Sequence, residues 1–135
     1  MSKRKKIKIA IYITLFIIAI ALLSWWFVFN IKRGRDYQRL GDMRVLESEL
    51  NIYFFKFNTY IVPECSVGSV VNFCTGKEDR KIKVEEIIDP KNSDDFRYIV
   101  AEMSDDNFRI EFYLETKMFK LLPGKYALTK EGLGR

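Results

Sequence analysis

The sequence predicts an α+β protein in which a long N-terminal helix packs on a small antiparallel sheet of three to four strands. An uncharged apolar segment near the N-terminus is followed by apolar residues at helical spacing, and the last third of the chain alternates apolar and polar residues. No proline occurs between Met1 and Val62, so nothing in this stretch has to break a helix. We expect one helix, half transmembrane and half amphipathic; the alternative is two helices separated by a kink near Gly34.

Residues 9–29 form the first half of this helix and contain no charged side chain. A helix of that length spans roughly 30 Å, the thickness of the hydrocarbon core of a bilayer. The segment ends in aromatic side chains of the kind that concentrate at membrane–water interfaces: Trp25, Trp26, Phe27 and Phe29. A secretory signal peptide is the alternative, but its apolar region is usually about 7–15 residues long and precedes a small-residue cleavage site. We expect an uncleaved transmembrane helix over residues 9–31 after a basic tail of residues 1–8.

Basic residues on both sides of the segment predict its orientation. Five precede it and three follow it: Lys3, Arg4, Lys5, Lys6 and Lys8 before, and Lys32, Arg33 and Arg35 after. The side with more basic residues is retained in the cytoplasm. We therefore expect a single-pass protein of the cytoplasmic membrane, with the N-terminus inside and a domain of residues 32–135 outside.

The net charge of +5 comes from these membrane-flanking residues. Residues 1–35 contain eight of the 23 Lys and Arg residues and none of the 18 Asp and Glu residues, so residues 36–135 contain 15 basic and 18 acidic side chains. A nucleic-acid-binding domain would need a basic stripe, so no nucleic-acid partner is expected. The chain also lacks histidine, a CxxC pair and a glycine-rich phosphate loop. We expect neither enzymatic activity nor a small-molecule substrate.

Residues from about 36 to 58 form the second half of the helix. Their apolar residues recur at steps of three and four, which places them on one stripe: Leu40, Met43, Leu46, Leu50, Phe54 (or Tyr53) and Phe57. The charged residues of this segment, Arg39 among them, are predicted to lie largely elsewhere on the helix. We expect the stripe to cover the apolar face of the sheet, because such a face must be buried.

Cys65 and Cys74 lie in a loop of about residues 60–80. Their spacing does not fit a redox or zinc motif. On the outer side of the membrane a loop of this size is expected to be closed by a disulfide, with about 2–3 kcal/mol of stabilisation. The alternative is two unpaired thiols in a reducing environment.

The sheet is predicted over about residues 96–128. Apolar and polar residues alternate from Phe96 to Val100 and again from Phe108 to Glu115. A third strand is predicted from Met118 to Leu122, and Tyr126 to Leu128 adds a short edge.

Short motifs form an ordered pattern along roughly residues 35–116. In the helix they are Arg35-Asp36, Arg39-Leu40, Asp42-Met43, Leu46, Leu50 and Tyr53. Asn58 to Pro63 follows at the end of the helix, and the second half of the chain adds Asp89-Pro90, Tyr98, Ile110 and Leu114-Glu115. This pattern resembles type IV pilins and the pseudopilins of type II secretion. The resemblance implies a half-hydrophobic helix laid against a small antiparallel sheet, and function through contacts with other pilin-like or envelope membrane proteins.

The N-terminal segment departs from this family. Pilins begin with a short basic leader, a small residue at the cleavage point and a glutamate five residues into the mature chain. Lys8 to Leu15 contain no such motif, and no acidic residue precedes Asp36. In that family the glutamate is associated with subunit assembly. We therefore expect neither leader processing nor a homopolymeric pilus.

One candidate metal site follows from the resemblance, because some pseudopilins bind calcium in their C-terminal loops. The candidate ligands are Asp89, Asn92, Asp94 and Asp95. They offer hard oxygen atoms, as calcium requires, without the spacing of an EF-hand. The alternative is that these are solvated turn residues. No other cofactor is expected.

Together these features predict a membrane-anchored, pilin-like or pseudopilin-like structural or assembly protein of the cell envelope. Its expected partners are the lipid bilayer and other pilin-like or envelope membrane proteins. The alternative is a non-polymerising membrane-anchored binding module or accessory subunit of an envelope complex, which the missing glutamate favours.

Overall fold

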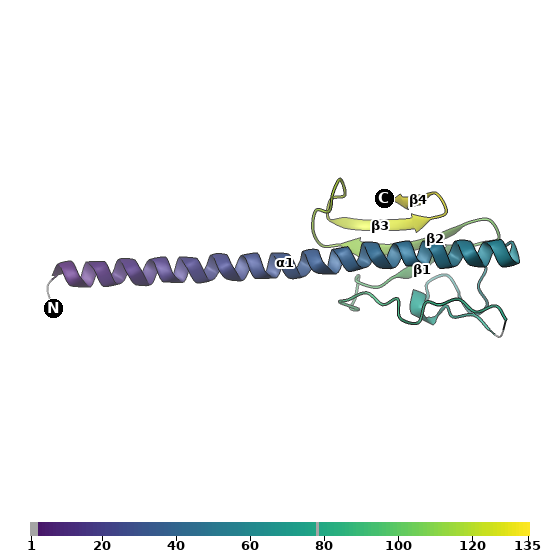
Figure 1. Cartoon of the computed structure of the whole chain (residues 1–135), viewed down its shortest axis with the longest axis horizontal. Coiled ribbons are helices and arrows are strands. Elements are labelled where there is room, and N and C mark those ends of the chain that lie inside the picture. Colours follow the sequence, from purple (N-terminus) through teal and green to yellow (C-terminus); the bar gives the residue numbers. More distant parts are fainter. Residues whose placement is uncertain (1–2, 78) are drawn as a thin grey trace.

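The computed structural model describes residues 3–77 and 79–135. It confirms the α+β class: one long N-terminal helix packs against a small antiparallel sheet of four strands (Figure 1). The elements in chain order are α1 (Lys3–Phe57), the 3-10 helix η1 (Val71–Phe73), β1 (Ile99–Met103), β2 (Phe108–Leu114), β3 (Gly124–Thr129) and β4 (Gly132–Gly134). The strands lie in the sheet in the order β1-β2-β3-β4.

α1 is one uninterrupted helix of 55 residues, so the chain is helical through Gly34 without a break. It begins at Lys3, within the predicted basic tail, of which Met1 and Ser2 lie outside the described residues. It ends at Phe57, where Asn58 takes a φ of 53°, a left-handed conformation that commonly stops helices.

The N-terminal half of α1 projects away from the domain as a single rod (Figure 1), and residues 7–34 are all exposed. Within the described residues, α1 is the one helix long and apolar enough to cross a membrane, with a mean hydropathy of 2.5 over its best window. No residue of that window is buried by the rest of the chain. This half of the helix is therefore compatible with a single-pass membrane anchor.

The C-terminal half of α1 lies across the sheet and buries one stripe. Its fully buried positions alternate in steps of three and four: Asp36, Arg39, Met43, Leu46, Leu50 and Tyr53. Three further apolar side chains of the stripe are partly buried and pack against the core: Leu40, Phe54 and Phe57. The stripe thus covers the sheet, but its first two positions are charged. The expectation that Arg39 lies away from the stripe is wrong, because its side chain is completely buried.

One face of the sheet supplies the other half of the core. Alternate residues of β2 are buried, as the two-residue period of a strand requires: Phe108, Ile110, Phe112 and Leu114. Ile110 lies at the centre of the sheet, where it pairs with Val100 of β1 and Leu128 of β3. All three side chains are buried under α1.

The segment between α1 and β1 is mostly irregular and packs along one side of the core (Figure 1). Its buried aliphatic side chains are Val62, Val71, Ile82, Val84 and Ile87. Residues 68–71 also pair with the outer edge of β1, where the Gly68 amide donates to the Val100 carbonyl at 2.7 Å. The edge of β1 is thereby covered, which protects it from pairing with other chains.

Cys65 and Cys74 form the predicted disulfide, with their Cα atoms 4.5 Å apart. The bridge encloses residues 68–71, the segment that covers β1. It therefore holds the irregular segment against the sheet at the point where that segment replaces a strand.

β1 is shifted from the predicted Phe96 to Val100 to Ile99–Met103, and the last two strands differ further from the predicted ones. Met118 to Leu122 is not a strand: the backbones of Met118 and Leu121 exchange two hydrogen bonds in a tight turn, in which Phe119 has a φ of 53°. β3 begins only at Gly124 and lies between β2 and β4. β4 was not predicted, because two of its three residues are glycine and give no alternating pattern.

Replacing Leu46 by alanine is expected to destabilise the domain by about 2–5 kcal/mol, because it opens a cavity between α1 and the sheet. The matched control is the neighbouring Val45→Ala, which removes an exposed side chain and should change stability by less than about 0.5 kcal/mol. Urea unfolding of the full chain in detergent, followed by the near-ultraviolet circular dichroism of its tyrosines, measures both. Equal effects of the two changes would contradict the packing described here.

Candidate functional site at the junction of helix and sheet

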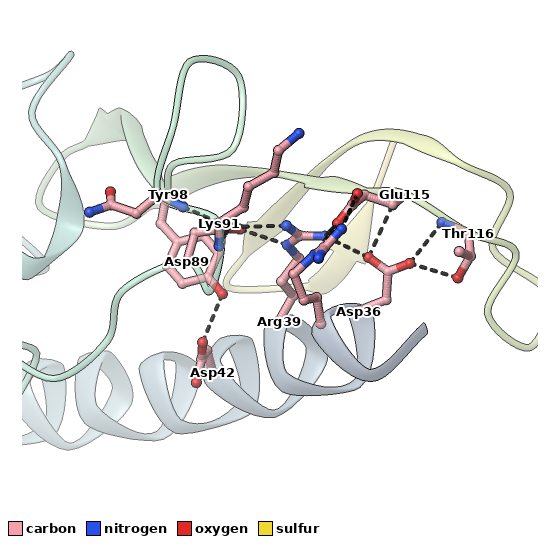
Figure 2. A network of polar contacts seen from close by, with 10 residues as sticks. Asp36, Arg39, Asp42, Asp89, Lys91, Tyr98, Glu115 and Thr116 are labelled. Atoms are coloured by element: carbon pink, nitrogen blue, oxygen red, sulfur yellow. Dashed lines mark hydrogen bonds and ion pairs between the residues drawn. The ribbon is translucent and has the colours of Figure 1, made fainter. Parts of the chain in front are cut away.

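Arg39 is the centre of a buried network of charged side chains (Figure 2). α1 supplies Arg39 and Asp36, and the loop before β1 supplies Asp89. The two residues that directly follow β2, Glu115 and Thr116, complete it. Three parts of the chain that are distant in sequence therefore meet at one guanidinium group.

The guanidinium of Arg39 donates to three carboxylates. Nε and Nη2 donate to the two oxygens of Asp89 at 2.6 and 3.0 Å, a bidentate pair. Nη1 donates to Asp36 at 2.8 Å and to Glu115 at 2.9 Å. One face of the guanidinium also lies 4.9 Å from the centre of the Phe96 ring. Bidentate and charge-assisted hydrogen bonds are the strongest in proteins and fix orientation, so this arginine holds the three elements in one geometry.

Asp36 fastens the helix to the end of β2. Its Oδ2 atom accepts hydrogen bonds from the amide and the hydroxyl of Thr116, both at 2.7 Å. Its Oδ1 atom accepts from the Glu115 amide at 3.0 Å as well as from Arg39. One carboxylate on α1 thus accepts hydrogen bonds from two backbone amides just beyond the end of β2. These amides have no partner in a neighbouring strand, and buried amides need one.

Glu115 joins a second arginine to the network. Arg35, one turn before Arg39, donates through Nε and Nη2 to the two Glu115 oxygens, each at 2.7 Å. The network therefore contains two positive side chains and three negative ones: Arg35 and Arg39 with Asp36, Asp89 and Glu115. Within the described residues, every buried side-chain nitrogen and oxygen has a hydrogen-bond partner.

The hydrogen bonds shift the titration of these groups. Arg35, and then Arg39, lower the pKa of the Glu115 carboxyl from an ordinary 4.5 to about 2. Burial would lower the pKa of Arg39, but its bonds to Asp89, Glu115 and Asp36 raise it above the ordinary value. Arg39 and Glu115 consequently stay charged throughout the neutral range.

A tyrosine–carboxylate pair continues the network along α1 (Figure 2). The buried Tyr98 hydroxyl donates to Asp42 at 2.7 Å. Burial raises the pKa of the Asp42 carboxyl, although the bond from Tyr98 opposes this, and burial together with the same bond raises the pKa of Tyr98. The pair adds a further tie between the helix and the residue that precedes β1.

Asp89, the first of the candidate calcium ligands, is an ion-pair partner of Arg39 in this structure. Both of its oxygens bind the guanidinium, and Oδ1 also accepts from the Lys91 amide at 2.8 Å. The other candidate ligands, Asn92, Asp94 and Asp95, lie in the turn that follows, where Asp94 and Asp95 are exposed. In the part of the chain that the structure describes, no three His, Cys, Asp or Glu side chains are close enough to hold a metal ion. Both oxygens of Asp89 accept hydrogen bonds from the guanidinium of Arg39.

Asp94 and Asp95 lie beside a depression of about 370 Å³ on the outer face of the sheet. Its other polar lining residues carry both signs of charge or a hydroxyl: Arg97, Glu111, Tyr113 and Lys125. Lys125 forms an ion pair with Glu111 across it. The depression brings together no nucleophile with a base and presents a polar, solvated surface.

The side of α1 that faces away from the sheet carries a second stripe, which we call the outer stripe. It follows the same three- and four-residue steps, is uncharged throughout and is largely exposed: Gly34, Tyr37, Gly41, Val45, Ser48, Ile52 and Phe55. At 100° per residue it lies opposite the buried stripe. Phe55 is 91% exposed. A helix with one apolar stripe in the core and another in solvent has a surface available to a further partner.

The buried network was missed by the sequence reasoning. A signal was present: continuing the buried stripe towards the N-terminus in the same steps from Met43 leads to Arg39 and Asp36. Arginine and aspartate are almost never fully buried unless they are paired, so an apolar pattern alone gives no reason to include them in the stripe. The partners, Asp89 and Glu115, are 50 and 76 positions away, and helical periodicity gives no information about them.

Replacing Arg39 by methionine is expected to destabilise the domain by about 3–5 kcal/mol, because it leaves the carboxylates of Asp36 and Asp89 buried without their counter-ion. Arg39→Lys should recover only part of this, since an ammonium group cannot form the bidentate pair. The control is Arg44→Met on the exposed side of α1, which should cost less than about 0.5 kcal/mol. Urea unfolding of the detergent-solubilised chain gives all three values; an Arg39→Met protein as stable as the parent would contradict the role of the network.

Glu115 predicts a particular dependence of stability on acid. Its pKa is lower in the folded chain, about 2, than the ordinary 4.5, so the carboxylate stabilises the fold above about pH 4.5. This contribution, about 3 kcal/mol, is lost as the pH falls towards 2. We expect Glu115→Gln to flatten the fall in thermal stability over this range, and Glu131→Gln, which removes the same charge from an exposed turn, to leave it unchanged. Parallel curves for Glu115→Gln and the parent would contradict the assignment.

Comparison with protein-family models, with curated proteins and with solved structures finds no match to this chain. The resemblance to type IV pilins and pseudopilins therefore stays a prediction made from the sequence. The fold and the network described above are observations of this chain alone.

Proposed function

We propose that this chain is a membrane-anchored, pilin-like or pseudopilin-like assembly protein of the cell envelope. It acts without catalysis, through contacts between α1 and the helices of neighbouring membrane proteins. The apolar half of α1 holds it in the cytoplasmic membrane with the N-terminus inside, and the folded domain stands on the outer side.

The outer stripe is the observation that carries this proposal. Small residues let two helices approach closely, and steps of three and four are those at which packed helices interlock. Gly34 and Gly41 meet no other atom within 4 Å of the position that a Cβ would occupy, so the domain itself gains nothing from them. A glycine costs a helix about 1 kcal/mol relative to alanine. The outer stripe is therefore suited to contact with a partner helix that lies along this side of α1.

The residues of the buried network add a second line of support. Several of the motifs through which the sequence resembles pilins converge on it: Arg35-Asp36, Arg39, Asp42, Asp89, Tyr98 and Glu115. In the sequence these motifs are separate, but in the structure they have one common role, to fix the sheet on the helix. A protein that presents one face of α1 to a partner needs its domain held in a fixed orientation on the opposite face.

The absence of an acidic residue before Asp36 favours one form of this function, the accessory subunit that does not polymerise by itself. A charge inside a membrane is costly and is retained for a purpose. Without it, α1 has no intramembrane charge with which to pair with a copy of itself, and a different membrane protein is the expected neighbour.

Photocrosslinking tests the proposal. A photoreactive amino acid at Val45 or Ile52, in native membranes, should crosslink to a helix of another membrane protein, and the same group at Arg109 on the outer face of the sheet should not. Gly41→Leu should abolish the crosslinks, because a large side chain keeps the helices apart. It should not lower the stability of the domain, since the position is open and glycine is a poor helix former.

The products distinguish the two forms of the function. Crosslinks between copies of this chain indicate a homopolymer, and crosslinks to a second protein indicate the accessory subunit. Equal crosslinking from Val45 and Arg109, or crosslinks that persist in Gly41→Leu, would contradict the proposal.

A further inference from the structure

The turn between β2 and β3 exposes an apolar side chain between two lysines. We call residues 117–122 the proximal loop, because they lie at the end of the domain nearest the N-terminal half of α1 (Figure 1). Phe119 is 75% exposed, and Lys117 and Lys120 are exposed on either side of it. Leu122 adds a second exposed apolar side chain. Phe119 also contacts the half-exposed Tyr37, and exposed apolar side chains that are grouped in this way form a surface suited to contact with a membrane or another protein.

The conformation of this loop holds Phe119 outward. The backbones of Met118 and Leu121 pair by two hydrogen bonds of 3.0 and 2.8 Å, and Met118 itself is buried. Phe119 at the tip has a φ of 53°, a left-handed conformation that is rare and costly for a bulky residue. The loop is therefore a closed turn with an anchored base, and its aromatic tip stays outside the core.

Contacts with α1 fix the position of the loop along the helix. The ring of Phe119 packs edge-on against Tyr37 at 6.3 Å, and the guanidinium of Arg33 lies 5.8 Å from the Tyr37 ring. Ile31 is the last apolar residue before the basic residues that follow the membrane segment. Tyr37 lies six residues further on, a rise of about 9 Å along a helix. The headgroup region on each side of a bilayer is about 5–7 Å thick. With α1 across a membrane, the proximal loop is at the level of the headgroups or just above them, and a modest tilt brings it into contact.

The charges around the loop have one sign. The proximal loop contains two exposed lysines, Lys117 and Lys120, and no acidic residue, and residues 30–35 of α1 contain three basic residues and no acid. The acids nearest to the loop and to this part of α1 in sequence, Glu115 and Asp36, are turned into the Arg39 network, and Arg35 is paired there as well. The exposed charges that remain on the loop and on the adjoining part of α1 are thus all basic, Lys117, Lys120, Lys32 and Arg33, and they accompany an apolar tip.

We propose that the proximal loop docks on the anionic phospholipid surface of the bilayer that α1 crosses. Phe119 inserts among the headgroups beside Tyr37, where aromatic side chains are favoured, and Lys117 and Lys120 bind phosphate groups. This is a second attachment of the domain to the membrane, additional to the span. It rests on the membrane anchoring of α1, and it shares with the outer stripe only Tyr37, whose ring Phe119 contacts.

A second attachment has a mechanical consequence. A single helix through a bilayer is free to tilt and to rotate about its axis. A contact at one side of the helix removes the rotational freedom, because only one rotation places the loop on the lipid surface. The loop therefore sets the direction in which the outer stripe points within the plane of the membrane.

Depth-dependent quenching of tryptophan fluorescence tests the proposal on the full chain in vesicles. In a Trp25→Phe, Trp26→Phe background, Phe119→Trp reports on the loop and Phe55→Trp, at the far end of α1, is the matched control. In vesicles of equal phosphatidylcholine and phosphatidylglycerol, phospholipids brominated near the headgroup should quench the fluorescence of the Phe119→Trp protein but not that of the Phe55→Trp protein. Replacing Lys117 and Lys120 by glutamine should weaken the docking equilibrium, by about fivefold for each lysine, and phosphatidylcholine alone should do the same.

Each other outcome overturns the proposal. Quenching of the Phe119→Trp protein no greater than that of the Phe55→Trp protein would show that the loop does not reach the lipid. Quenching that disappears when the protein is diluted in the membrane would assign the surface to a second copy of the chain. Equal quenching with and without anionic lipid would remove the role of the lysines.

Two further measurements separate a wrong proposal from a failed variant. Quenching of the native Trp25 and Trp26 by phospholipids brominated on their acyl chains tests the membrane anchor by itself. A nitroxide attached to Lys120→Cys, which leaves Phe119 in place, should be more accessible to oxygen than to a polar nickel complex when the loop is docked. The reverse accessibility, with the anchor intact, would overturn the docking of the loop.

Discussion

The guanidinium of Arg39 joins the helix, the loop before β1 and the end of β2 through four hydrogen bonds to three carboxylates. Removing an arginine from water is costly, and the pairing offsets this only when the geometry satisfies all partners. The surrounding structure meets this condition: Asp36 is further bonded by Thr116, Asp89 by the backbone of the following turn, and Glu115 by Arg35. Apolar contacts between α1 and the sheet would tolerate some sliding of one over the other. Directed hydrogen bonds do not, so the network selects one position of the sheet along the helix.

That fixed position gives α1 two distinct sides. The buried stripe belongs to the domain, and the outer stripe remains in solvent along the same helix. Because α1 is continuous from Lys3 to Phe57, the orientation of the domain is set by the orientation of the apolar half. A kink would uncouple the orientation of the domain from that of the apolar half. In one continuous helix the orientation of the apolar half fixes the direction in which the outer stripe points.

The aromatic residues divide between these surfaces in a way that composition alone does not reveal. Tyr98, Phe108 and Phe112 are buried and fill the core. Phe55 on the outer stripe and Phe119 on the proximal loop are mostly in water. Exposed aromatic side chains add nothing to the stability of the isolated domain. Phe55 and Phe119 lie where the proposed contacts with a partner helix and with the lipid surface would form, whereas the exposed Phe73 of η1 lies on neither surface.

The sequence by itself determined the features that depend on local patterns. An uncharged segment followed by three- and four-residue spacing without proline specifies one long helix, alternation specifies β2, and two cysteines in one loop specify the disulfide. Tertiary structure decided what depends on partners distant in the chain. Arg39 is buried only because Asp89 and Glu115 arrive from 50 and 76 residues away, and the same contact makes Asp89 an ion-pair partner. Met118 to Leu122 has the apolar composition of a strand but forms a turn. The edge of β2 with which it would have to pair is occupied by Gly124 to Thr129. A local pattern indicates which side chains are buried. Which charged side chains pair, and which strands lie side by side, depends on contacts between distant parts of the folded chain.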